Sequence, residues 1–189
     1  MNASFLADKF AAALPYEGYV RTGTEEQQRR WRQVYEAARL SPTQAELVGR
    51  FGRDMKVLIV SGIWCGDCVQ QCPLLQRCAE ANPGRVDLRL LDRDEHRDLS
   101  GQLHINGGDR VPVVLFLAED HELCVVYGDR TLTRYRALAA RQLGASCPLG
   151  LFPQDQDELA ATLQDWLNEM ERVQLMLLLS ARLRQKHGD

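Results

Sequence analysis

The stretch that most constrains the fold is 55–73, where an apolar segment runs directly into two cysteines separated by two residues. Residues 55–60 are apolar except for one lysine, a pattern typical of a buried strand, and helical spacing follows the cysteines. This order places Cys65 at a strand-to-helix junction and Cys68 one turn inside the helix. Free N–H groups at the helix start favour a thiolate, so we expect Cys65 to be the nucleophile. Cys68, shielded by the first turn, is expected to attack the mixed disulfide and release the substrate.

The composition indicates a single core with appendages. The chain has 189 residues, 45% of them apolar, and a formal net charge of −3, so no basic surface for nucleic acid is expected. The first ten residues lack a basic segment followed by an apolar one, and no uncharged stretch is long enough to span a membrane. We therefore expect a cytoplasmic protein with no membrane span. Without a signal peptide, six cysteines favour reactive or metal-binding thiols over a structural disulfide set.

Residues 1–53 are predicted to be a helical extension. The segment 24–27 has the sequence of a capping box before a helix that carries Trp31 and Tyr35, and Ser41-Pro42 begins another helix. An aromatic stripe at helical spacing could line a pocket, but such stripes usually make core contacts. We interpret Trp31 and Tyr35 as core residues.

The region 54–147 is predicted to be an α/β domain with the element order β-α-β-α-β-β-α. The helix after the cysteines contains Pro73 and ends at an Asn-Pro-Gly sequence. Asp94 is expected to cap a short helix that runs through Leu103, and the third strand opens with Val111-Pro112, a position where a proline is tolerated. The remaining elements are strands over 85–91, 111–117 and 122–127 and a helix over 131–143.

Three features together resemble the thioredoxin superfamily: Trp64-Cys65-Gly66-Asp67-Cys68, Pro73 five residues later, and Val111-Pro112 at the start of the third strand. The loop Asn106-Gly107-Gly108 is similar to a bacterial thioredoxin-like branch.

The resemblance implies a thioredoxin-like fold, a central mixed sheet flanked by helices, and supports the roles given to Cys65 and Cys68. It also implies that Pro112 is in the cis form, which brings the Val111 backbone close to the dithiol, where it can pair with an extended substrate. The substrate-binding residues it implies are Trp64, Gly66, Asp67, Val111 and Pro112.

Two positions depart from classical thioredoxins. Ile59 stands where they have a buried acid that helps to move the proton of the resolving thiol, so this aid is expected to be absent here unless a glutamate or a water substitutes. Asp67 stands where they have a proline, and the redox potential is left open.

The other cysteines have a structural interpretation. Cys65, Cys68 and Cys72 could suggest a metal site, but structural zinc needs four ligands and no Cys or His pair at ligand spacing supplies the fourth. We therefore expect no metal and no cofactor. The remaining cysteines are interpreted as small core or loop residues: Cys72, Cys78, Cys124 and Cys147. An intermolecular disulfide through Cys147 is left open.

The segment 148–189 is predicted to be a loop followed by an amphipathic helix of about thirty residues. Its apolar positions recur at steps of three and four, at Leu159, Leu163, Trp166, Met170, Val173 and Leu177. The seam could pack against the chain's own N-terminal helices, form a homodimer, or, as a minor option, associate with a membrane surface.

Two classes of function follow. The first is a thiol–disulfide oxidoreductase, a disulfide reductant acting through Cys65 and Cys68 on a disulfide-containing protein or a small thiol, and recycled by an unidentified reductant. The second is a thioredoxin-fold interaction module with little turnover. Reduction of a model disulfide distinguishes them.

Overall fold

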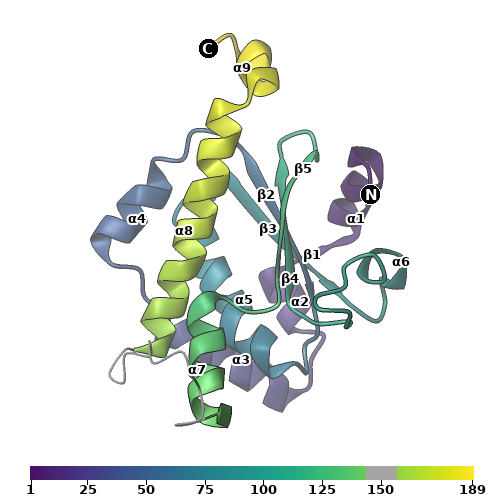
Figure 1. The fold of residues 1–189 in the computed structure, drawn as a ribbon, viewed down its shortest axis with the longest axis vertical. Helices are drawn as coiled ribbons and strands as arrows, with labels where there is room; N and C mark the ends of the chain where they lie inside the picture. Colours follow the sequence, from purple (N-terminus) through teal and green to yellow (C-terminus); the bar gives the residue numbers. More distant parts are fainter. Residues whose placement is uncertain (144–156) are drawn as a thin grey trace.

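The computed structural model describes residues 1–143 and 157–189, in which five strands form one sheet (Figure 1). The N-terminal elements are α1 (Ala3–Ala12), β1 (Leu14–Pro15), α2 (Tyr16–Val20), α3 (Glu25–Ala37) and α4 (Pro42–Gly49). The central elements are β2 (Met55–Ser61), α5 (Gly66–Glu80), β3 (Val86–Asp92), α6 (Arg97–Ser100), β4 (Val113–Ala118), β5 (Leu123–Gly128) and α7 (Leu132–Leu143). The C-terminal helices are α8 (Glu158–Leu179) and α9 (Ala181–His187).

The sheet is mixed, with the strand order β1-β3-β2-β4-β5. Strands β2 and β3 are parallel, whereas β4 is antiparallel to β2, β5 to β4 and β1 to β3. This confirms the predicted α/β class and the element order from β2 to α7. The N-terminal region is helical as predicted except for β1, which has only two residues and is too short to show a strand periodicity.

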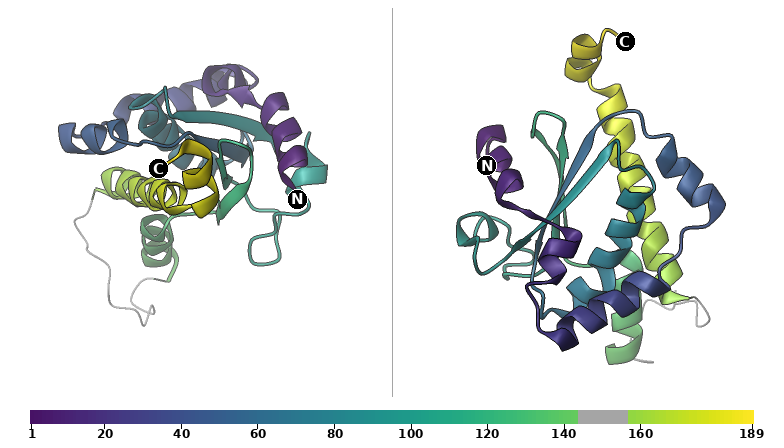
Figure 2. Two further views of the ribbon diagram at one scale, coloured as in Figure 1. Left: turned by 90° about the horizontal axis from the view of Figure 1, so that it is seen from above. Right: turned by 180° about the vertical axis from the view of Figure 1, so that it is seen from behind.

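The two faces of the sheet carry different helices. Side chains alternate along β2, so Lys56 and Leu58 lie on one face and Ile59 and Ser61 on the other. The Lys56 ammonium lies 5.6 Å from the centre of the Phe10 ring of α1, which places α1 over the first face. Helices α5 and α8 lie on the opposite side of the sheet from α1 (Figures 1 and 2). Ile59 and Ser61 therefore point towards the helix that carries the cysteines.

Helix caps account for several element boundaries. The capping boxes predicted from the sequence are both present, at Thr24 with Gln27 and at Ser41 with Gln44. The predicted cap at Asp94 is wrong: α6 begins at Arg97, and the N–H of Asp94 instead donates to the Asp92 carboxylate at 2.7 Å. A tight turn therefore takes the place of the first turn of the predicted helix.

Helix α8 is part of the core, whereas the loop predicted before it lies outside the described residues. Of the six predicted seam residues, Leu159 is partly buried. The other five are buried: Leu163, Trp166, Met170, Val173 and Leu177. Helix α8 contacts α5, α7 and β5, and of the N-terminal helices it makes an appreciable contact only with α4. The predicted helix of about thirty residues is interrupted at Ser180, whose side chain caps α9. Among the described residues, no helix combines the length and the apolar character that crossing a bilayer requires.

Candidate active site

The two cysteines of the motif lie at the start of α5, as predicted. Cys65 is the N-cap residue, and its N–H donates to the Gly62 carbonyl at 2.9 Å, so the loop after β2 closes tightly before the helix begins. Cys65 is partly exposed, whereas Cys68 is 0% exposed beneath the first turn. The Gly62 N–H points at the Cys68 sulfur at 3.5 Å. An accessible thiol therefore lies next to a shielded one.

The residues just before β4, which begins at Val113 rather than at the predicted Val111, face the accessible thiol. The Val111–Pro112 peptide bond is cis, as the resemblance implies, and the Cys65 sulfur lies 3.5 Å from the Val111 carbonyl oxygen. The backbone at Val111 thus lies against the reactive sulfur. Val111 itself is mostly buried, so its carbonyl rather than its side chain is presented to the sulfur.

The pKa values of Cys65 and Cys68 differ from what the helix start alone predicts. A hydrogen bond with Cys68 raises the pKa of Cys65 and burial raises it further, although the N–H groups of Cys68 and Asp67 act in the opposite direction. Burial likewise raises the pKa of Cys68 well above that of an ordinary thiol, against an opposing hydrogen bond with Cys65. The helix start does favour a Cys65 thiolate, but contact with the neighbouring thiol and burial outweigh it.

The loop between β2 and Cys65 is held by the N-terminal helices. Trp31 of α3 donates its indole N–H to the Ile63 carbonyl at 3.0 Å. Trp64 is 48% exposed, and the Arg93 guanidinium lies 4.9 Å from its ring centre. A side chain at Gly62 would come within 2.9 Å of the Trp64 ring, so glycine permits the ring to lie over the loop. The extension therefore positions the residues next to the dithiol.

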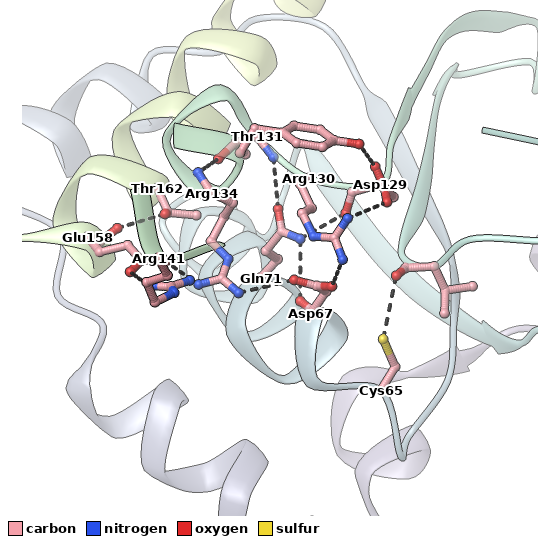
Figure 3. A network of polar contacts seen from close by, with 12 residues as sticks. Cys65, Asp67, Gln71, Asp129, Arg130, Thr131, Arg134, Arg141, Glu158 and Thr162 are labelled. Atoms are coloured by element: carbon pink, nitrogen blue, oxygen red, sulfur yellow. Dashed lines mark hydrogen bonds and ion pairs between the residues drawn. The ribbon is translucent and has the colours of Figure 1, made fainter. Parts of the chain in front are cut away.

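Asp67, two residues after Cys65, is held by two arginines (Figure 3). Arg130 donates to one carboxylate oxygen at 2.5 Å, and Arg134 of α7 donates to the other at 3.1 Å. Arg134 also pairs with Glu158, the first residue of α8, which Arg141 contacts at 2.8 Å. We call Asp67, Arg130, Arg134 and Glu158 the Asp67 network. It joins the motif to α7 and α8.

A second carboxylate supports Arg130 from the other side. Asp129 is 2% exposed and accepts from Arg130 at 2.9 Å, from Arg110 at 3.2 Å and from the Tyr135 hydroxyl. Burial alone would raise the pKa of Asp129, but the hydrogen bond from Tyr135 and the neighbouring guanidinium groups hold it below its ordinary value. Buried Gln71 of α5 donates to the Asp129 carbonyl at 2.9 Å, so this loop is fixed to the dithiol helix.

Sequence reasoning did not find Arg130, Arg134 or Gln71. Arg130 and Arg134 lie 63 and 67 positions after Asp67, and no local pattern links residues so far apart. Of the predicted site residues, Gly66 is an exposed first residue of α5 where a Cβ would meet nothing within 4 Å. The structure thus brings the predicted residues together around Cys65 and adds a charged layer behind Asp67.

The other cysteines divide by burial. Cys72 and Cys78 are 0% exposed on α5, and burial raises the pKa of Cys78 to about 12. Cys124 is partly buried on β5, and Cys147 lies outside the described residues. Within 1–143 and 157–189, no group of three or more His, Cys, Asp or Glu side chains is arranged to hold a metal ion.

Comparison with known proteins gives a family and a fold. A crystal structure of a protein of unknown function from Pseudomonas aeruginosa matches with a TM-score of 0.66 at 18% identity, over 88% of this chain and 95% of that one. An HIV epitope scaffold matches with a TM-score of 0.63 at 18% identity, over the same shares of the two chains. No curated protein is significantly similar. The thioredoxin family model matches residues 13–139, a span that contains the dithiol, the cis-proline and all five strands, and the chain therefore belongs to the thioredoxin family.

Proposed function

We propose that the protein is a thiol–disulfide oxidoreductase that reduces disulfides through Cys65 and Cys68. The observation that carries the proposal is the pairing of a partly exposed Cys65 with a fully shielded Cys68 at one helix start. A substrate disulfide can reach the first sulfur and only the first.

The reaction has two exchanges. The Cys65 thiolate attacks one sulfur of the substrate disulfide, forming a mixed disulfide and releasing the other sulfur as a thiolate that takes a proton from solvent. Cys68 then loses its proton and attacks the Cys65 sulfur, which forms the Cys65–Cys68 disulfide and releases the second substrate thiolate. The substrate gains two electrons and the protein loses them, so an external dithiol or thiol must regenerate the reduced protein.

The reducing direction is supported by the raised pKa of Cys65. A dithiol/disulfide couple becomes more oxidising when its reduced form is stabilised, and a thiolate with a low pKa provides such stabilisation. Contact with Cys68 and burial raise the pKa of Cys65, which removes this stabilisation. We therefore propose a reductant rather than an oxidant, working in a reducing compartment such as the cytoplasm.

The substrate class follows from the backbone at Val111. Its carbonyl lies 3.5 Å from the Cys65 sulfur, so an extended peptide that carries a disulfide could place its own main chain against this loop while its sulfur meets Cys65. Exposed Trp64, the residue before Cys65 in the chain, offers an apolar surface to the same peptide. A small disulfide would use only part of this surface, so we expect a protein disulfide to be preferred.

Catalysed reduction of insulin by dithiothreitol tests the proposal. The protein should accelerate precipitation of the reduced insulin chains, and Cys65→Ser should abolish the acceleration. The reduction potential of the Cys65/Cys68 couple should lie near the value of thioredoxin, about −270 mV, rather than near that of a strong oxidant, about −120 mV. No acceleration by the wild-type protein would favour the interaction module instead.

A further inference from the structure

A cavity lies next to the loop that carries the attacking thiol. Its volume is about 520 Å³, and two of its lining residues, Ile63 and Trp64, directly precede Cys65 in the chain. Binding sites for ligands usually occupy cavities of about 300–1,000 Å³. The two exchange reactions give this cavity no role, so a substrate that reaches Cys65 has room beside the sulfur for a side chain of its own.

The N-terminal extension and the sheet complete the wall. Ala12 at the end of α1 and Leu14 of β1 line the cavity, together with residues at the end of β3 and in the loop that follows it. Leu14 is 40% exposed and Trp64 is 48% exposed, so two large apolar side chains meet solvent at one cavity. Exposed apolar side chains that gather at one place are typical of a binding surface, whereas scattered ones are not.

The part of the wall next to the dithiol is fixed in position. The Trp31 indole N–H donates to the Ile63 carbonyl at 3.0 Å, which holds the loop to α3. The Arg93 guanidinium lies 4.9 Å from the centre of the Trp64 ring and donates to the Asp109 carbonyl at 3.0 Å. A wall that is already ordered lowers the entropy cost of binding an occupant.

The carboxylates that line the cavity set its charge. They belong to Asp92, Asp94 and Glu95, and among the described residues no lysine or arginine lines it. Asp94 pairs with neighbouring arginines, but in the described chain neither Asp92 nor Glu95 forms an ion pair. The Asp92 carboxylate accepts main-chain N–H groups, from Asp94 at 2.7 Å and from Glu95 at 3.4 Å. The wall therefore combines apolar surface with uncompensated negative charge.

Two nearby cations are bound to other groups. Arg93 pairs with Asp94 at 3.2 Å and lies over the Trp64 ring. The Lys9 ammonium donates to the Asp98 carboxylate at 2.8 Å. Neither cation lines the cavity, so the charge of the wall is complementary to a cation that comes from another molecule.

We propose that this cavity is a subsite that receives a lysine or arginine side chain of the protein substrate, next to the cysteine that Cys65 attacks. The carbon chain of either residue would lie against Leu14 and Trp64, and its cationic end would lie at Asp92 and Glu95. The proposal rests on the proposed function, because it specifies the sequence around the disulfide that the protein reduces.

The test compares short peptides whose single cysteine is joined to nitrothiobenzoate in a mixed disulfide. When Cys65 of the reduced protein attacks the peptide sulfur, a disulfide between Cys65 and the peptide forms and the coloured nitrothiobenzoate leaves as a thiolate. The absorbance therefore gives the rate of capture. The residues on either side of the peptide cysteine are lysine, alanine or glutamate in turn. At one of these positions the lysine peptide should react about 3- to 10-fold faster than the glutamate peptide, the factor expected for one or two partly exposed charge contacts.

Charge variants separate the cavity from the overall charge of the protein. Asp92→Asn and Glu95→Gln each remove one charge with little change of shape and should reduce the preference for lysine. The matched control is Glu122→Gln, which removes an exposed carboxylate from the turn between β4 and β5, at the end of the sheet away from the dithiol. It should leave the preference unchanged. All three variants should capture the alanine peptide at the rate of the wild type.

A pair of larger side chains tests the space itself. Ala11 and Ala12 are exposed neighbours on α1, and of the two only Ala12 lines the cavity. Ala12→Phe should slow the lysine peptide to about the rate of the alanine peptide, whereas Ala11→Phe should leave it at the rate of the wild type.

A preference for lysine that is unchanged in Asp92→Asn, Glu95→Gln and Ala12→Phe would overturn the subsite. Equal slowing in Ala11→Phe and Ala12→Phe would overturn it too, by showing that α1 matters only for packing. A wild-type protein that captures all the peptides at one rate would overturn the subsite and leave the proposed function intact. A wild-type protein that releases no nitrothiobenzoate from any peptide would contradict the proposed function itself.

Discussion

Removing the charge of Asp67 should make Cys65 more acidic. The carboxylate lies two residues after Cys65, is only 18% exposed, and forms ion pairs with the guanidinium groups of Arg130 and Arg134. In Asp67→Asn these two positive charges stay near the helix start without their shared partner, so the thiolate is stabilised. A charge at short range shifts a pKa by about 1–3 units, and solvent screening at this partly exposed site favours the lower end. One unit is about 1.4 kcal/mol, or about 30 mV towards a more oxidising couple.

The opposite charge change should have the opposite effect. In Arg134→Gln, Asp67 keeps Arg130 at 2.5 Å but loses the bond of 3.1 Å, so part of its charge is no longer compensated. The Cys65 thiolate should then become less stable, by a smaller amount than Asp67→Asn stabilises it. Arg141→Gln is the matched control, because it removes an arginine bonded to Glu158 that does not contact Asp67.

The measurement is the pH dependence of Cys65 alkylation by iodoacetamide in a Cys68→Ser background, where Cys65 titrates without its thiol partner. At neutral pH, Asp67→Asn should react about tenfold faster than this parent. Arg134→Gln should react more slowly, and Arg141→Gln at the parent rate. Shifts of the same sign in Asp67→Asn and Arg134→Gln, or no shift in either, would refute the electrostatic argument and show that solvent screens the Asp67 network.

Two further predictions concern stability. Trp166→Ala should lower the free energy of unfolding in urea by about 3–5 kcal/mol, because the side chain is fully buried and packs on Tyr127 at a ring distance of 4.9 Å. Leu179→Ala, at a position 76% exposed on the same helix, should change it by less than about 0.5 kcal/mol. A loss in Trp166→Ala as small as that in Leu179→Ala would show that α8 is not part of the core. The reduced protein should lose stability as the pH rises from about 9 towards 12, since the unfolded state releases the Cys78 proton while the folded state, in which burial raises the pKa of Cys78 to about 12, retains it. The slope is about 1.4 kcal/mol per pH unit for this group, and a slope that is unchanged in Cys78→Ala would contradict the assignment.

Local signals explain most of what the sequence predicts correctly. The correctly predicted features depend on residues within a few positions of one another: the apolar run of β2, the cysteines at the start of α5 and the capping boxes at Thr24 and Ser41. Amphipathic spacing also predicts which face of α8 is buried, because a helix repeats regularly whatever it packs against. It does not identify the partner, and α8 in fact packs on α5, α7 and β5 as well as α4.

The charged layer behind the motif could not be predicted in this way. Asp67 appears in the sequence as an isolated acid next to a thiol, and its two arginine partners come from the segment after β5 only once the sheet is assembled. The pKa of Cys65 could not be predicted from local sequence either. The helix start predicts one contribution of the correct sign, but the opposing contributions of burial and of the Cys68 contact depend on tertiary packing.

The most direct test of the central claim is to trap the mixed disulfide. Cys68→Ser should accumulate a covalent adduct with a disulfide-containing protein such as insulin, located on Cys65 by mass spectrometry, because the exchange that releases the substrate is missing. Cys65→Ser should trap nothing, since the remaining thiol of the motif is 0% exposed and cannot reach a protein disulfide. Cys72, equally buried, should carry no adduct in either variant. Adducts of equal yield in the two variants, or insulin reduction that persists in Cys65→Ser, would contradict the assignment of Cys65 as the attacking thiol.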